Sequence, residues 1–132
     1  MDIAALLTAA VEEIPGAVAV SLLGLDGVAV ETVQGPKPLV GTSRAHGPGA
    51  DLAAWEVELA DLMQGARRAA RSLNWGTLRQ VVLETRELTF MLRMVRPDYF
   101  LLLAVQQEAN MVRARFELQG LAAQIEQGLP AE

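Results

Sequence analysis

Residues 78–106 read LRQVVLETRELTFMLRMVRPDYFLLLAVQ, and this stretch decides the fold. It contains three short apolar runs, Leu78–Glu84, Leu88–Val95 and Tyr99–Gln106, which are separated by short polar links. Links of this length favour antiparallel pairing between neighbouring strands. Because both alternating faces of the runs are apolar, we expect helices to cover both sides of the sheet.

The segment at the start of the chain predicts a helix and a hairpin. Apolar residues recur at three- and four-residue spacing over residues 3–14, which predicts a short helix. Asp2 is suited to cap its start, and Pro15-Gly16 ends it. Alternating residues then predict two strands around Asp26-Gly27, a pair typical of a two-residue type I′ turn.

Two further helices complete the element order. Residues 34–50 are rich in glycine and proline, and we expect a flexible loop there. Asp51–Leu73 has apolar residues at helical spacing, and so does Asn110–Leu129. The order is α-β-β-α-β-β-β-α. It predicts a single domain over residues 1–132 of the α/β (α+β) class, a three-layer α/β/α sandwich around a five-stranded antiparallel sheet.

The composition limits the classes of function. The chain of 132 residues has a net charge of −5 and no cysteine, which excludes disulfides and thiolate chemistry. An acidic chain without a basic stripe disfavours nucleic acid as a partner. We find no apolar run near the length of a membrane span and expect no secretory signal. The sequence therefore predicts a cytoplasmic protein whose partners are proteins.

No set of residues predicts catalysis, a cofactor or a metal ion. His46 lies in the glycine- and proline-rich loop near Ser43 and Arg44, where nothing holds a catalytic base in place. A lone histidine without cysteine does not make a zinc site, and there is no phosphate-binding loop motif. We interpret the paired carboxylates as solvated surface charges; they are Glu12-Glu13, Glu56/Glu58 and Glu84/Glu87.

The third strand and the helix before it predict self-association. The apolar stripe of Asp51–Leu73 is wider than one sheet needs, which indicates a second packing partner. If Thr77–Thr85 lies at a sheet edge, its unpaired backbone groups favour pairing with a second copy of the chain. Arg79 would then lie opposite Glu84 of the partner subunit and fix the register. Alternatively, the strand is covered inside the sheet of its own chain.

Four features in order resemble the Roadblock / dynein light-chain domain family over nearly the whole chain. They are Ile14-Pro15-Gly16-Ala17 before a strand, the Leu25–Val30 hairpin, the Leu52–Leu73 helix, and Ala109–Leu118, which reads ANMVRARFEL. The last segment is similar to the start of the closing helix of that family. The loop at residues 35–49 is longer than the link usual in the family.

The resemblance implies a Roadblock/profilin-like fold and a homodimer with paired third strands and adjacent second helices. It further implies a non-enzymatic regulator or scaffold of a small Ras-like GTPase, which docks near the switch regions of the GTPase. The residues implied for the dimer interface are Arg79, Gln80, Val81, Leu83, Leu59 and Leu62, and those implied for partner binding are Trp55, Glu58 and Met63. Trp55 could equally belong to the core.

Two alternatives to a GTPase regulator stay open from the sequence. In a small-molecule sensor of the PAS type, a pocket would be lined by Phe90, Met91, Met94, Tyr99 and Phe100. In a pure scaffold, the dimer would be the same but would show no preference for a nucleotide state.

Overall fold

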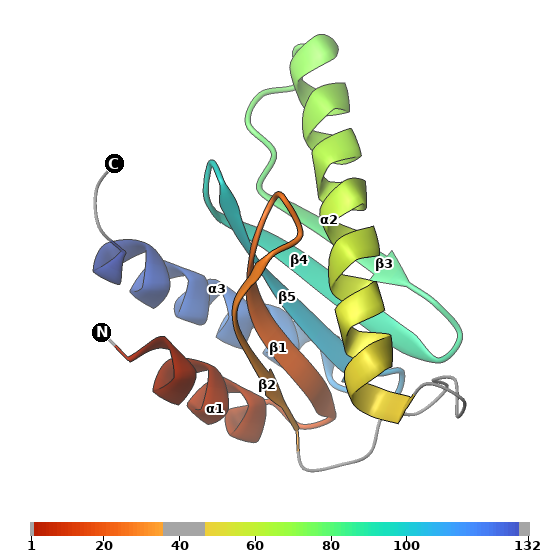
Figure 1. Ribbon diagram of the computed structural model, residues 1–132, viewed down its shortest axis with the longest axis vertical. Helices are drawn as coiled ribbons and strands as arrows, with labels where there is room; N and C mark the ends of the chain where they lie inside the picture. Colours follow the sequence, from red (N-terminus) through yellow and green to blue (C-terminus); the bar gives the residue numbers. More distant parts are fainter. Residues whose placement is uncertain (1, 36–46, 130–132) are drawn as a thin grey trace.

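The computed structural model describes residues 2–35 and 47–129, which form three helices and a five-stranded sheet (Figure 1). The elements are α1 (Ile3–Glu13), β1 (Ala17–Gly24), β2 (Ala29–Gln34), α2 (Gly47–Ser72), β3 (Gln80–Glu84), β4 (Leu88–Arg96), β5 (Tyr99–Gln106) and α3 (Met111–Gly128). The strands lie in the order β2-β1-β5-β4-β3, and every neighbouring pair is antiparallel. Helices α1 and α3 cover one face and α2 crosses the other, which confirms the predicted three-layer α+β fold.

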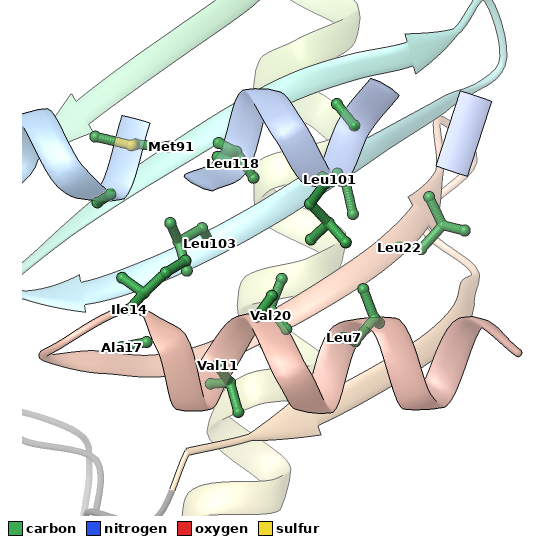
Figure 2. Close-up of a cluster of buried hydrophobic side chains, with 14 of the residues drawn as sticks. Leu7, Val11, Ile14, Ala17, Val20, Leu22, Met91, Leu101, Leu103 and Leu118 are labelled. Atoms are coloured by element: carbon green, nitrogen blue, oxygen red, sulfur yellow. The ribbon is translucent and has the colours of Figure 1, made fainter. Parts of the chain in front are cut away.

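The core consists of two apolar clusters, one on each face of the sheet. Strand β5 contributes side chains to both clusters. Leu101 and Leu103 point towards α1 and α3, while Phe100 and Leu102 point towards α2. Figure 2 shows the first cluster, in which Leu7 of α1 packs with side chains of β1, β5 and α3. The double-faced burial explains why the strands read as nearly continuous apolar runs.

Local capping fixes the ends of the helices where the sequence predicted them. The Asp2 side chain accepts a hydrogen bond from the Ala5 N–H at 3.1 Å, and Asn110 caps α3 in the same way through the Arg113 N–H at 3.0 Å. Helix α2 ends in a Schellman motif, with Asn74 in the left-handed conformation at φ 57°. The Trp75 N–H then reaches the Ala70 carbonyl at 2.9 Å.

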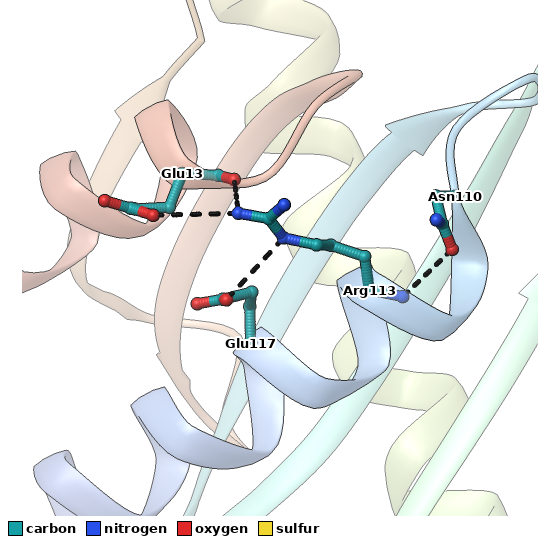
Figure 3. Close-up of polar contacts among 4 residues, drawn as sticks. All are labelled: Glu13, Asn110, Arg113 and Glu117. Carbon is teal, nitrogen blue, oxygen red and sulfur yellow. Dashed lines mark hydrogen bonds and ion pairs between the residues drawn. The ribbon is translucent and has the colours of Figure 1, made fainter.

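An arginine joins the two helices of the same face. Arg113 of α3 donates to the Glu13 carbonyl at the end of α1, and its guanidinium also lies 3.8 Å from the Glu13 carboxylate (Figure 3). Glu117, one turn further along α3, is 3.7 Å from Nε of the same arginine. These groups are partly exposed, so the ion pairs add little to stability and mainly orient α1 against α3.

One turn and the bounds of three elements differ from the sequence predictions. The hairpin turn is not type I′, because Gly27 alone has a positive φ, of 88°, while Asp26 accepts a hydrogen bond from the Val28 N–H. Helix α2 begins at Gly47, so residues 47–50 are helical rather than part of the loop. Strand β3 is shorter than expected. Gln34, which was also assigned to the loop, is the last residue of β2. Residues 36–46 of the predicted loop lie outside the described residues.

Candidate functional site

Strand β3 lies at one end of the sheet, with β4 as its neighbour among the described strands. This confirms the prediction of an edge position. The Met94 N–H donates to the Arg79 carbonyl and the Thr85 N–H donates to the Leu88 carbonyl, both at 2.9 Å. In an antiparallel ladder, hydrogen-bonded positions alternate along a strand. The backbone N–H and C=O groups of the odd-numbered residues of β3 therefore point towards β4. Those of Gln80, Val82 and Glu84 point away from the sheet.

The same alternation places the side chains of β3 on two faces. Val81 and Leu83 are half-buried and pack against the cluster under α2. Val82 and Glu84 point to the opposite face, and Val82 is 42% exposed. The predicted pair of Arg79 with Glu84 of the partner subunit is corrected, because directly opposed residues share a face and a hydrogen-bonding class. Arg79 belongs to the odd set and Glu84 to the even set.

The exposed apolar side chains in the middle of α2 lie on two different sides of the helix. Val57, 56% exposed, lies against Gly27 of the β1–β2 hairpin. Leu62, 38% exposed, lies two turns after Trp55, on the side of α2 towards β4 and the β3 edge. Leu59, by contrast, is almost completely buried in the core beneath the helix. Leu59 and Leu62 were both expected at the dimer interface. Only Leu62 is exposed enough to contact a partner.

The three residues expected to contact a partner lie at different depths of α2. Glu58 is exposed. Trp55 is half-buried, and its ring meets Phe90 edge-on at a centroid distance of 5.4 Å. Met63 has no exposed surface and packs in the core. Because its thioether is fully buried, Met63 cannot contact a partner and does not belong to the candidate surface.

Glu56 has a structural role that the sequence interpretation missed. It was expected to be solvated like Glu58, but it is 9% exposed and lies between α2 and the β1–β2 hairpin. Its Oε2 accepts hydrogen bonds from the Ser21 hydroxyl at 3.0 Å and the Thr32 hydroxyl at 2.7 Å. Gln64, two turns further along α2, donates to the Leu25 carbonyl of the same hairpin. Polar contacts thus fix α2 over the hairpin.

Apart from Glu56, the candidate polar residues of the sequence lie at the surface or outside the described residues. His46, Ser43 and Arg44 lie outside the described residues. Glu12, Glu13, Glu84 and Glu87 are exposed, as predicted. Within residues 2–35 and 47–129, no three histidine, cysteine or carboxylate side chains form a group that could hold a metal ion.

The side chains proposed for a sensor pocket do not meet in one cavity. Met91 packs with the α1/α3 cluster, whereas Phe90 and Phe100 pack under α2 on the other face of the sheet. The described helices also include none that is long and apolar enough to cross a membrane.

Solved structures of bacterial proteins share this architecture. A Roadblock/LC7 domain from Streptomyces avermitilis superposes with a TM-score of 0.77 at 20% identity, covering 96% of this chain and 97% of that one. MglC from Myxococcus xanthus is 31% identical over 98% of this chain and 100% of its own, with a TM-score of 0.66. The gliding protein MglB from Thermus thermophilus reaches 0.76 at 13% identity, covering 96% of this chain and 90% of its own. No family model and no curated protein matches the sequence.

These findings define the class of protein. A five-stranded antiparallel sheet with two helices on one face and one on the other is the fold of the Roadblock domain structures. With 31% identity to MglC over its full length, the chain belongs to the Roadblock family.

Proposed function

We propose that this chain is a homodimeric, non-enzymatic regulator of a small Ras-like GTPase. The observation that carries the proposal is the β3 edge, which no second described strand pairs, with Leu62 exposed on the side of α2 towards that edge, on a fold shared with MglB and MglC. An edge strand with outward N–H and C=O groups favours pairing with another strand, and an identical strand closes the assembly with two-fold symmetry.

The backbone geometry selects the register of the proposed pairing. Two β3 strands that pair through their even-numbered residues can place Val82 opposite Val82 of the partner subunit. Gln80 then lies opposite Glu84 of the partner subunit, on the face away from α2. Their side chains can form a hydrogen bond worth about 0.2–1 kcal/mol. This pairing replaces the Arg79 contact expected from the sequence.

The two α2 helices would lie on the same side of the joined sheet and form a docking surface. Leu62 is apolar and exposed, and Glu58 lies one turn before it on the helix. The interface core would bury the Leu62 side chain, and Glu58 would lie at the polar rim. Docking near the switch regions regulates the GTPase only if the affinity differs between its two nucleotide states.

The test is binding to a small Ras-like GTPase of the source organism, loaded with GTP or with GDP and measured by calorimetry. We expect the affinities for the two loaded forms to differ by about tenfold or more, a coupling free energy of about 1.4 kcal/mol. Equal affinities would contradict regulation and support a scaffold. No binding of either form would contradict the proposal altogether.

A pair of charge reversals locates the docking surface. Glu58→Arg on α2 should weaken GTPase binding about tenfold. Glu12→Arg is the matched control, because Glu12 is equally exposed but belongs to α1 on the other face of the sheet. Equal effects of the two variants would contradict docking on α2.

A further inference from the structure

Several arginines line a groove at one end of the sheet. The groove has a volume of about 840 Å³ and is lined by the last turns of α2, the α2–β3 link, the end of β4 and the β4–β5 turn. In Figure 1 the α2–β3 link and the β4–β5 turn lie at the same end of the sheet, below the last turns of α2. Five arginines line it, against one acidic residue, Glu126; they are Arg67, Arg71, Arg79, Arg93 and Arg96. Half of the ten arginines of an acidic chain are thus gathered here.

Unequal strand lengths create the groove. Strand β4 continues to Arg96, whereas β3 begins only at Gln80, opposite Arg93. The Schellman motif at Asn74 turns the chain away from α2, so that Gly76, at φ 99°, and the residues after it form one wall. The overhanging end of α2 forms the opposite wall.

Three of the five arginines donate hydrogen bonds to neutral acceptors. Arg67 donates to the Pro97 carbonyl at 2.6 Å, and Arg93 donates to Oε1 of Gln80 at 3.2 Å. Arg96 donates to the carbonyls of Glu126 and Leu129 at the end of α3. Arg67, Arg71, Arg79 and Arg93 form no ion pair with a carboxylate among the residues that the structure describes.

We propose that this groove binds an acidic, partly apolar peptide segment of a partner protein. Guanidinium groups recognise carboxylates through paired N–H donors, and a hollow lined by one sign of charge strengthens the attraction. Between the arginines lie apolar side chains, of which Leu78 and Met94 are half-buried. A segment that alternates acidic and aliphatic residues matches both components. The inference rests on the proposed function only in taking the ligand to be part of a protein.

A peptide fits the groove better than a phosphate-bearing small molecule. The arginines come from α2, the α2–β3 link and β4, so that they are distributed along the groove. A single phosphate group is bound by convergent donors, often at a helix N-terminus, whereas this groove contains the C-terminal end of α2. Separate cations with apolar side chains between them suit the spaced carboxylates of an extended chain.

The test uses a short fluorescein-labelled peptide that alternates glutamate with leucine and alanine, and a second peptide with glutamine in place of each glutamate. Fluorescence anisotropy with the full chain should show binding of the first, and about tenfold weaker binding of the second. The double variant Arg71→Glu/Arg79→Glu should also weaken binding of the glutamate peptide about tenfold or more. Arg68→Glu is the matched control, because Arg68 is exposed on the same helix but does not line the groove. It should leave binding within about twofold.

Three results would overturn the inference. Equal weakening by Arg68→Glu would show a diffuse charge effect rather than a site. Displacement of the peptide by pyrophosphate at lower concentration than by unlabelled peptide would assign the groove to a phosphate ligand. Loss of dimer in the Arg71→Glu/Arg79→Glu variant, measured by sedimentation, would assign the arginines to self-association.

The outcome is separable from that of the proposed function. Peptide binding by a chain that binds neither form of the GTPase would leave the groove assignment in place and remove the GTPase. State-dependent GTPase binding without peptide binding would do the reverse.

Discussion

Replacing Glu56 by alanine should destabilise the fold by about 3 kcal/mol. The carboxylate accepts from the fully buried Ser21 hydroxyl and from the half-buried Thr32 hydroxyl, at 3.0 and 2.7 Å. A hydrogen bond to a charged acceptor contributes about 1.5–3 kcal/mol, and a buried donor left without a partner costs a similar amount. Thr32 can turn to water in the variant, so we assign about 2 kcal/mol to Ser21 and about 1 kcal/mol to Thr32. Such a loss is a large fraction of the roughly 5–15 kcal/mol of a typical domain.

Urea unfolding at one fixed protein concentration measures this loss. With a slope of about 2 kcal/mol per molar, the midpoint should fall by about 1.5 M in Glu56→Ala. Glu58→Ala, two residues further along the same helix and exposed, should change the unfolding free energy by less than about 0.5 kcal/mol. In the double variant with Ser21→Ala, the two losses should overlap by about 1–2 kcal/mol. Equal effects of Glu56→Ala and Glu58→Ala would refute a structural role for the buried carboxylate.

Three further substitutions test the packing, each by the same unfolding measurement. Gly16→Ala should cost about 2 kcal/mol, because φ is 84° and the new Cβ would lie 2.8 Å from Cβ of Ala109; no loss would contradict the tight turn. Asn110→Ala removes the cap on the Arg113 N–H and should cost about 1 kcal/mol, while Asn110→Asp should restore most of it. Met63→Ala should cost about 3 kcal/mol through the cavity it leaves, and a negligible loss would mean that Met63 is not in the core.

The elements that the sequence predicted well are those whose signals are local. Strand β5 matched its predicted range, Tyr99–Gln106, because a continuous apolar run ends at polar residues on both sides. Helix α3 matched because Asn110 caps it through its own side chain. The turn at Asp26-Gly27 was wrong in type because turn geometry also depends on the register of β1 against β2, which shifts between Leu22 and Leu23.

The candidate site depends on contacts between distant segments, which no local pattern shows. Nothing in the local sequence distinguishes Glu56 from Glu58. They differ because Glu56 accepts hydrogen bonds from the hydroxyls of Ser21 and Thr32, which are distant in sequence. The register of β3 on β4 decides which backbone groups of β3 point out of the sheet, and the sequence does not show this register. The pair of Arg79 with Glu84 of the partner subunit, expected from the sequence, is therefore one that an antiparallel ladder does not allow. The arginine groove as a whole has no local signal in the sequence, because its members range from α2 to the end of β4.

Sedimentation equilibrium on Val82→Pro tests the central claim most directly. The Val82 N–H points out of the sheet, so proline removes a donor from the edge and leaves the hydrogen bonds to β4 in place. We predict that the parent chain and Val82→Thr, which keeps the N–H, sediment at twice the 14.2 kDa chain mass, and that folded Val82→Pro sediments at 14.2 kDa. A parent chain that stays at 14.2 kDa, or a proline variant that stays dimeric, would contradict pairing through β3.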